Sequence, residues 1–417
     1  MSPSCISERL LALGKAAEGE AGFIFEELNR AASKNTEKVL SAYHKHRVSD
    51  ALFAGTTGYG YSDSGRDVLD EIYADVFGGE AGLVRITFVN GTHAIACALF
   101  SALRQGDVLL SATGPLYDTL KTVAGLNEEK RGTFSDYGIG YREVPMKGAL
   151  PDLPAISAAA TDKAVKAVFI QRSRGYSDRR ALSCAMIGEI VETVRKVNRN
   201  AAVIVDNCYG EFVETVEPCD VGADLVAGSL IKNPGGGIAP AGGYIVGRED
   251  LVKAAAFRLT VPGIGGECGA TFGQNRLLYQ GFFMAPHTVL QALKTAVFCA
   301  YVMEKLGFSV SPSFSDKRYD IIQTIRFGRE GPLLEFCKGI QQSSPVDSFA
   351  TPEPWDMPGY DCKVVMAAGA FIQGASIELS CDAPMREPYT AYLQGALTYE
   401  SGRLGILTAA QRIIELS

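Results

Sequence analysis

The sequence predicts an α/β protein with a large domain built on a mainly parallel sheet, followed by a smaller α+β domain. Two observations carry this prediction. Between residues 68 and 246, short and almost wholly apolar segments alternate with segments whose apolar residues recur at helical spacing. From about residue 286 this alternation gives way to a long helical stretch and shorter mixed segments. Strands that are apolar along their whole length need cover on both faces, as in parallel sheets.

The first part of the chain, residues 1–55, is expected to form a helical arm. Ile24, Phe25, Leu28 and Ala31 recur there at helical spacing. Residues 55–66 (GTTGYGYSDSGR) break all periodicity and are rich in Gly, Ser and Tyr, which predicts a loop.

The large domain is expected over residues 56–288. In it the patterns predict helices over 68–77, 93–104 and 187–197, and strands over 83–88, 108–111, 164–170, 201–205, 224–227 and 243–246. In such sheets ligands bind beyond the carboxyl ends of the strands. The residues that directly follow each strand are therefore the candidates for function.

The smaller domain is expected over residues 289–417. A helix is predicted over 289–306, then a Pro/Ser-rich segment over 309–316, a helix near Leu333, and strands over 364–368 and 376–380. The chain shows neither internal repeats nor a low-complexity tract.

Composition narrows the class of protein. The 417 residues are 47% apolar and 21% charged, and the net charge is −7. No Lys/Arg block stands out. The charge pattern therefore argues against nucleic acid or an anionic membrane as the main partner. The N-terminus lacks the pattern of a signal peptide, and no apolar run approaches the ~20 residues that span a bilayer. The ten cysteines form no CxxC pair and the chain has four histidines. We therefore expect a cytoplasmic protein with reduced thiols and no structural metal.

Three strand ends carry residues that together suit pyridoxal 5′-phosphate (PLP). That cofactor needs a lysine to bond its aldehyde and later move a proton, and a carboxylate to keep its ring nitrogen protonated. It also needs a helix N-terminus with small residues to hold its phosphate. Lys232, Asp206 and the Gly91-Thr92 turn supply these parts in a workable order.

Two further residues complete the expected cofactor site. Ser229 precedes the lysine closely enough to add a hydroxyl to the phosphate, and Tyr117 follows the strand that ends near Ser111, where its ring can stack on the cofactor. Each residue alone could be a cap or a surface group. Their combination and order carry the prediction of a PLP enzyme.

Long segments resemble the Cys/Met-metabolism PLP enzymes of fold type I. The resemblance is closest to a branch of cystathionine β-lyase-like and methionine γ-lyase-like proteins labelled aluminium resistance proteins. It covers nearly the whole chain and is carried by GYGYSDSGRDVLDEIYADVFGGE, NGTHAIACAL, GPLYDTL, FIQRSRGYSDRR, VDNCYGEF, GSLIKNPGGGIAPAGGYIVG and IELSCDAPMREPY. It implies a large PLP domain, a small C-terminal domain, and a homodimer or homotetramer with shared active sites.

The resemblance also implies roles for single residues. Lys232 would carry the cofactor, Asp206 would hold its ring nitrogen, Tyr117 would stack on it, and Gly91, Thr92 and Ser229 would bind the phosphate. In related enzymes a Tyr and an Arg of the neighbouring subunit also clamp the phosphate. Tyr59, Tyr61 and Arg66 are the candidates here, and the spacing does not choose between the two tyrosines.

The chain departs from the family pattern at three places. Ile231 stands where related enzymes have Thr before the lysine, and Thr119 stands where methionine γ-lyases have Cys. The stretch that usually supplies the arginine for the substrate carboxylate corresponds to Glu378-Leu379-Ser380. We therefore consider Arg386 first, and Arg174 and Arg172 second, as candidates for binding the substrate carboxylate.

These observations predict a PLP-dependent carbon–sulfur lyase that acts on a sulfur-containing amino acid of the cystathionine, cysteine or methionine type by β- or γ-elimination. Three alternatives stay open at this point. One is another fold type I reaction, such as transamination, racemisation or an aldol-type cleavage, and another is a stress protein that binds PLP or a metal-stress ligand without turnover. The third is a nucleotide-binding Rossmann protein, which is disfavoured because no GxGxxG follows the first strand of a βαβ unit.

Overall fold

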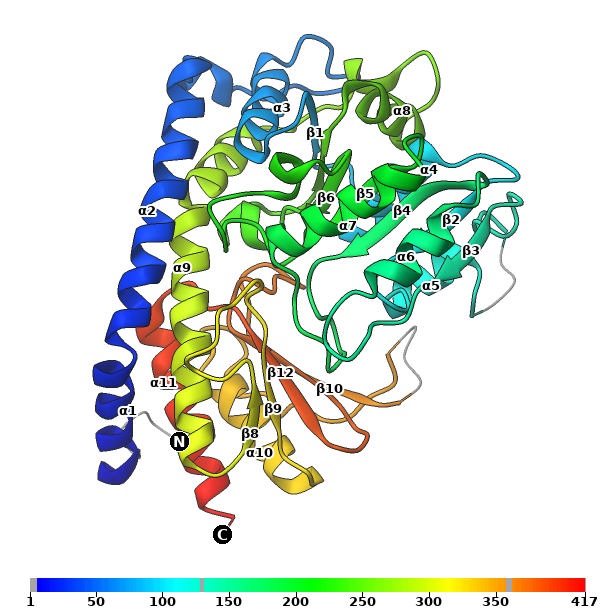
Figure 1. Cartoon of the computed structure of the whole chain (residues 1–417). Coiled ribbons are helices and arrows are strands. Elements are labelled where there is room, and N and C mark those ends of the chain that lie inside the picture. The colour runs from blue at the N-terminus through cyan, green and yellow to red at the C-terminus, as the bar shows by residue number, and fades with distance from the viewer. Residues whose placement is uncertain (1–5, 128–130, 358–361, 417) are drawn as a thin grey trace.

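The computed structural model describes residues 6–127, 131–357 and 362–416, so Cys5 lies outside the described residues. Two sheets form the frame of the molecule (Figure 1). A seven-stranded sheet belongs to the first two thirds of the chain and a five-stranded sheet to the last third. The long helices α2 and α9 run beside each other along one side of both sheets (Figure 1).

The larger sheet has the strand order β1-β7-β6-β5-β4-β2-β3. Its strands are β1 (Ala81–Arg85), β2 (Val108–Ser111), β3 (Gly140–Glu143), β4 (Val165–Gln171), β5 (Ala202–Asp206), β6 (Leu225–Ser229) and β7 (Gly243–Gly247). All neighbours from β3 across to β6 are parallel, and only β7 runs antiparallel to β6 and β1. The predicted mainly parallel sheet is confirmed.

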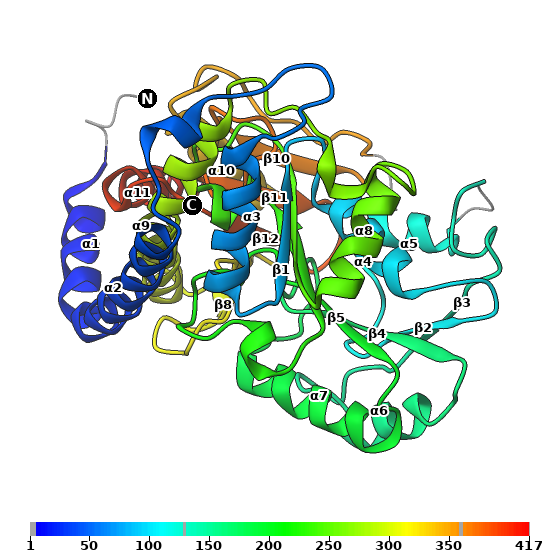
Figure 2. The same ribbon diagram turned by 90° about the horizontal axis from the view of Figure 1, so that it is seen from above.

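Helices cover both faces of this sheet because side chains alternate along its strands. On β5, Val203 and Val205 belong to a core shared with α3 (Ser64–Phe77), α6 (Leu153–Ala160) and α7 (Cys184–Val197). Ala202 and Ile204 belong to a second core, shared with α4 (Gly91–Ala102), α5 (Asp118–Ala124) and α8 (Glu249–Leu259). Figure 2 shows the sheet between these two groups of helices.

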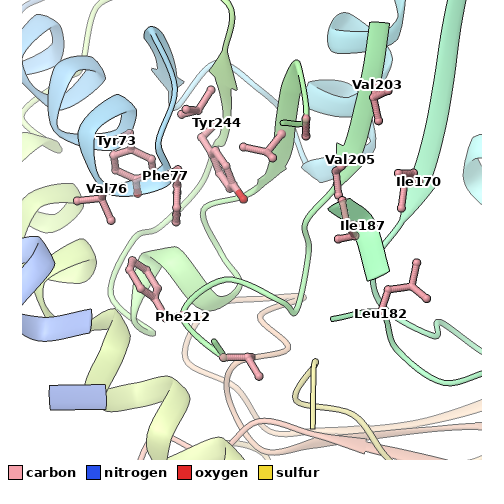
Figure 3. Close-up of a cluster of buried hydrophobic side chains, with 14 of the residues drawn as sticks. Tyr73, Val76, Phe77, Ile170, Leu182, Ile187, Val203, Val205, Phe212 and Tyr244 are labelled. Atoms are coloured by element: carbon pink, nitrogen blue, oxygen red, sulfur yellow. The ribbon is translucent and has the colours of Figure 1, made fainter. Parts of the chain in front are cut away.

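The first core holds the strands that end at the candidate residues. Tyr73, Phe77, Phe212 and Tyr244 pack together at one side of it, and the Phe77 ring centre lies 5.1 Å from that of Tyr244 (Figure 3). Val203 and Val205 of β5 lie at its other side, beside Ile170 and Ile187 (Figure 3). Because these side chains are fully buried, the end of β5 has a fixed position.

The N-terminal helices α1 (Glu8–Glu20) and α2 (Gly22–Lys45) agree with the helical character expected for the first part of the chain. Leu10 and Ala17 of α1 pack into the core of the smaller domain. Helix α9 spans Asn275–Lys305, so the expected start at residue 289 is wrong and the expected domain boundary falls inside a continuous helix. Pro286 suggested a break, but it removes only one backbone hydrogen bond, and the buried neighbours Ala285 and Val289 hold the helix in place.

The smaller sheet is antiparallel throughout, with the order β10-β11-β12-β9-β8. Its strands are β8 (Ser309–Ser311), β9 (Gln323–Arg326), β10 (Val364–Ala368), β11 (Ser380–Pro384) and β12 (Thr390–Gln394). Helices α10 (Glu330–Gln342) and α11 (Tyr399–Ile414) share a core with one of its faces. The other face lies toward the larger sheet, and polar contacts cross the gap between the two.

Three further sequence-predicted boundaries are wrong. The strand expected to reach residue 88 ends at Arg85, whose guanidinium pairs with Asp70 on α3, and a turn follows. Helix α3 begins at Ser64, inside the expected loop, because the Asp63 side chain accepts a hydrogen bond from the backbone N–H of Arg66. The strand expected over 376–380 starts only at Ser380. Among the described residues, no helix is long and apolar enough to cross a membrane.

Candidate active site

A cavity of about 750 Å³ opens at the carboxyl ends of the parallel strands, between the two sheets. This volume is in the range of small-ligand pockets. The cavity brings together most of the residues singled out in the sequence, and those that line it are Gly91, Thr92, Tyr117, Arg174, Asp206, Ser229, Lys232 and Arg386. Arg172, Tyr59, Tyr61 and Arg66 lie elsewhere in the described structure and are treated below.

Asp206 is the last residue of β5 and is buried. Its Oδ1 atom accepts a hydrogen bond of 3.0 Å from the backbone N–H of Cys208, which fixes the carboxyl group at the end of the strand. Burial raises the pKa of Asp206, and the positive charge of Lys232 opposes this shift. The two groups therefore form an electrostatically coupled pair inside one cavity.

Lys232 lies in the loop after β6, and its Nζ atom is 4.0 Å from the centre of the Tyr209 ring. The loop is anchored by the next residue, since the Asn233 side-chain amide donates to the Glu211 carbonyl oxygen over 3.0 Å. Burial alone would lower the pKa of Lys232, but Cys208, Tyr209 and Asp206 together raise it above its ordinary value. These three neighbours therefore stabilise the charged ammonium form of Lys232.

The N-terminus of α4 supplies the place for an anion. The Asn90 side chain accepts a hydrogen bond of 2.9 Å from the backbone N–H of His93 and so caps the helix. A Cβ atom on Gly91 would lie 3.1 Å from the Cβ atom of Ser229, so the glycine allows the helix end to approach the end of β6 closely. The remaining N–H groups of the first turn, the positive end of the helix dipole and the hydroxyls of Thr92 and Ser229 suit a phosphate.

Tyr117 directly precedes α5 and lies next to this helix end. Its hydroxyl donates to the Oγ1 atom of Thr92 over 3.3 Å, and Thr92 also lies 3.2 Å from the hydroxyl of Thr119. Burial, and then the nearby Asp206, raise the pKa of Tyr117, so its phenol is neutral and can donate a proton.

The three arginines considered for the substrate carboxylate lie in different environments. Arg172 is fully buried and its guanidinium pairs with Glu214 and Glu217 at 2.8 and 3.3 Å, an arrangement that suits a structural role. Arg174 lines the cavity, but its guanidinium donates to the Ser311 carbonyl oxygen over 3.0 Å and so joins the two domains. Arg386 is exposed at the rim of the cavity.

Three cavity residues were missed in the sequence. Tyr209 contacts Lys232, and Tyr176 and Arg179 line the cavity in the loop after β4. The Arg179 guanidinium donates to the carbonyl oxygens of Gln171, over 2.6 Å, and Ser173. Burial lowers the pKa of Arg179 to about 10, which still leaves it charged at neutral pH. All three residues follow a strand of the parallel sheet. The rule that selected Asp206, which inspects the residues after each strand, could therefore have found them as well.

The loop residues expected to reach a neighbouring subunit lie outside this chain's own cavity. The Tyr59 and Tyr61 side chains are 73% and 61% exposed, and their ring centres are 5.7 Å apart. Arg66 is buried and donates to the carbonyl oxygens of Gly60 and Gly269 over 2.7 and 3.0 Å. In the single chain Arg66 therefore holds the loop together.

The residues of the cavity fit PLP. A lysine amine and a buried carboxylate lie in one cavity, and a capped helix end with a close-packed glycine and two hydroxyls faces the same space. Among the described residues, no group of three or more His, Cys, Asp or Glu side chains is arranged so that it could hold a metal ion.

A family model described as methionine gamma-lyase matches residues 10–414. An uncharacterized protein of Bacillus subtilis, YnbB, is 50% identical over 400 residues, which cover 95% of each chain. A Clostridium acetobutylicum crystal structure, provisionally named cystathionine beta-lyase involved in aluminum resistance, is 51% identical with a TM-score of 0.95, and the match covers 98% of this chain and 96% of the other.

A more distant solved structure supports only the assignment of the fold. The PLP-dependent protein YhfS of Escherichia coli is 16% identical with a TM-score of 0.63 over 93% of this chain and 97% of the other. The large mainly parallel sheet and the smaller antiparallel sheet match this PLP fold type I architecture, as predicted.

Proposed function

Because the chain belongs to the methionine gamma-lyase family, we propose that it is a PLP-dependent carbon–sulfur lyase acting on a sulfur-containing amino acid. The observation that carries the proposal is the shared cavity of Lys232, Asp206 and the N-terminus of α4. Lys232 would carry the cofactor, Asp206 would hold its ring nitrogen, and Gly91, Thr92 and Ser229 would bind its phosphate.

The cofactor, when bound, would supply an electron-accepting ring for the bonds at the substrate's α-carbon. Lys232 would then remove the α-proton, because its amine lies in the same cavity as the residues proposed to hold the cofactor. The negative charge of Asp206 would keep the ring nitrogen protonated. Burial raises the pKa of Asp206. A protonated ring nitrogen beside it would favour the ionised carboxylate and so oppose this rise.

Tyr117 would assist loss of the thiolate. Its phenol is neutral, lines the cavity and is oriented by Thr92, so it can both stack on the cofactor and donate a proton to the sulfur. Release of a thiol from the β or γ carbon would leave a 2-oxo acid and ammonia after hydrolysis. Thr119 replaces the cysteine of methionine γ-lyases beside this tyrosine, which favours substrates other than methionine.

We place the substrate carboxylate near Arg386 or Arg179. Both side chains line the cavity, whereas the guanidinium of Arg172 pairs with two glutamates. Arg386 is exposed at the rim, whereas Arg179 donates to backbone carbonyl oxygens, so Arg386 remains the first candidate for the substrate carboxylate.

We also propose a homodimer or homotetramer with shared active sites. Tyr59 and Tyr61 are exposed and lie outside their own chain's cavity, which is where residues that reach into a neighbouring site would lie. No disulfide joins any two of the nine described cysteines, which fits the proposed cytoplasmic location.

The test compares visible absorbance and product release for the wild type, Lys232→Ala and the exposed control Lys253→Ala. We expect PLP-dependent visible absorbance in the wild type and the control, and its loss or shift in Lys232→Ala. Addition of L-cystathionine, L-cysteine or L-methionine should then release a thiol and a 2-oxo acid. Absence of both products from all three compounds would reject the lyase, and exchange of the amino group with pyruvate would support an aminotransferase instead.

A further inference from the structure

Glu211 is a fully buried acid that the proposed reaction does not use. It lies in the segment that follows β5 and Asp206. Its Oε1 atom accepts a hydrogen bond of 2.9 Å from the Tyr244 hydroxyl on β7. A Cβ atom on Gly228 of β6 would lie 2.7 Å from the same oxygen. The carboxyl group is therefore packed closely against two strands and has little room to move.

Glu211 also holds the loop that carries Lys232. Its backbone carbonyl oxygen accepts a hydrogen bond of 3.0 Å from the side-chain nitrogen of Asn233, the residue directly after the lysine. Asn233 is fully buried, so water cannot replace this bond. A change in the position of Asn233 therefore reaches Lys232 through a single peptide bond.

Two oxygen atoms beside this bond have no hydrogen-bond partner among the described residues. They are Oε2 of Glu211 and Oδ1 of Asn233, and both are buried. An amide oxygen and an ionised carboxylate oxygen can only accept, so an ionised Glu211 would leave both atoms unsatisfied. A protonated carboxyl group carries one O–H donor, which is what the Asn233 oxygen lacks. The two side chains are complementary only while Glu211 keeps its proton.

The charges around Glu211 favour the protonated acid. Burial raises the pKa of Glu211 to about 8. The negative charge of Glu217 adds to this rise, and the positive charge of Lys232 opposes it. Another nearby cation, Arg172, is already paired with Glu214 and Glu217. The remaining titratable groups that face Glu211 are uncharged at neutral pH because burial raises their pKa: Tyr73, Cys208 and Tyr244.

We propose that the Glu211 carboxyl group donates its proton to the Asn233 side-chain oxygen and so holds the loop of Lys232 in place. This inference rests on the proposed role of Lys232 as the lysine that carries PLP. Glu211 is a positioning residue, because it acts through Asn233 and does not line the cavity. Loss of the proton leaves buried acceptor oxygens without a donor between them, and this cost loosens the loop.

The competing interpretation is that Glu211 only fills the core between β6 and β7. Three substitutions separate the two. Glu211→Gln keeps an acceptor for Tyr244 and has an amide donor at every pH, so it imitates the protonated acid. Glu211→Leu is of similar size but has neither group. Asn233→Ala removes the other half of the contact.

The test follows hydrogen exchange of the peptide that spans residues 228–236, on the PLP-loaded protein, in steps from about pH 6 to about pH 10. Exchange rates are corrected for the intrinsic effect of pH, and visible absorbance is recorded on the same samples. Glu189→Gln, on the exposed side of α7, is the matched control. Melting temperatures identify any variant that has lost its fold, and the variants alter two different residues, so the test does not depend on one of them.

We expect exchange in the wild type and in Glu189→Gln to become about tenfold faster as pH rises through about 8, the scale of one buried hydrogen bond. Visible absorbance should change at the same midpoint. Glu211→Gln should keep the slow rate throughout, whereas Glu211→Leu and Asn233→Ala should exchange fast at every pH.

Two results overturn the proposal: exchange of the wild-type loop that does not depend on pH, or the same midpoint in Glu211→Gln as in the wild type. If the wild type shows no visible absorbance with PLP, the proposed role of Lys232 fails. The exchange measurement needs no cofactor and still decides whether Glu211 holds the loop.

Discussion

The amine nitrogen of Lys232 lies 4.0 Å from the centre of the Tyr209 ring. Tyr209 has a φ of 72°, a left-handed conformation that costs a bulky residue roughly 1–3 kcal/mol and persists only when the surroundings enforce it. The ring face stabilises a nearby cation. Tyr209 therefore holds the lysine amine close to Asp206 rather than letting it extend to solvent.

This contact predicts different outcomes for two substitutions. Tyr209→Leu removes the ring and should lower kcat for thiol release by about thirtyfold, since a desolvated cation–π contact is worth about 2 kcal/mol. Tyr209→Phe keeps the ring and should stay within about threefold of the wild type. Equal losses in the two variants would show that the hydroxyl, and not the ring, is what matters.

Parts of this site could be predicted from the sequence, and others could not. Lys232 and Asp206 stand out because each follows an apolar strand, and the rule for parallel sheets places such residues at one edge. Asp382 is different: its contact with Tyr176 joins residues 206 positions apart. The predicted strand there began too early, so the face that Asp382 occupies could not be derived.

A second prediction concerns the helix end that is proposed to hold the phosphate. A Cβ atom on Gly91 would lie 3.1 Å from the Ser229 Cβ atom and 3.5 Å from the Cys208 sulfur. Gly91→Ala should therefore shift the first turn of α4 away from β6 and weaken PLP binding by about tenfold, through the loss of charge-assisted hydrogen bonds. Equilibrium dialysis of the purified protein against PLP measures this change.

The control is a glycine in open surroundings. Gly19 lies in helix α1, and an added Cβ atom would meet nothing within 4 Å. Gly19→Ala should leave PLP affinity unchanged and raise the free energy of unfolding by about 0.5–1 kcal/mol, because alanine favours the helix. Wild-type PLP affinity in Gly91→Ala would contradict the proposed role of this close approach.

A third prediction separates a structural arginine from a substrate arginine. Arg172 is buried and pairs with Glu214 and Glu217, and removing the arginine leaves the buried Glu217 carboxylate uncompensated. Arg172→Leu should lower the free energy of unfolding by about 3–5 kcal/mol. Urea-induced unfolding measures this loss, and KM for the fraction that stays folded should be unchanged.

Arg386→Ala should behave in the opposite way. Its side chain is exposed at the cavity rim, so the free energy of unfolding should stay within about 0.5 kcal/mol of the wild-type value. KM for the amino-acid substrate should rise about tenfold if a charged hydrogen bond to the carboxylate is lost. A rise in KM for Arg172→Leu instead would reassign the carboxylate to the buried arginine.

The last prediction concerns the pH dependence of stability at Glu211. This side chain is fully buried, its Oε1 atom accepts a 2.9 Å hydrogen bond from the Tyr244 hydroxyl, and its Oε2 atom has no hydrogen-bond partner. Burial raises the pKa of Glu211 from 4.5 to about 8. The carboxyl group is therefore protonated in the folded protein at neutral pH.

The sign of the effect follows from proton linkage. Between about pH 4.5 and 8 the folded state keeps a proton that the unfolded state has lost, so each unit of rising pH removes up to about 1.4 kcal/mol of stability through this group. Glu211→Gln abolishes that term while keeping an acceptor for Tyr244. The free energy of unfolding of the variant, relative to the wild type, should increase by roughly 2–4 kcal/mol from pH 5 to pH 8. The control Glu189→Gln, on the exposed side of α7, should show no such increase. If the free energy of unfolding of the wild type and of Glu211→Gln changes with pH in parallel, Glu211 is ionised in the folded protein.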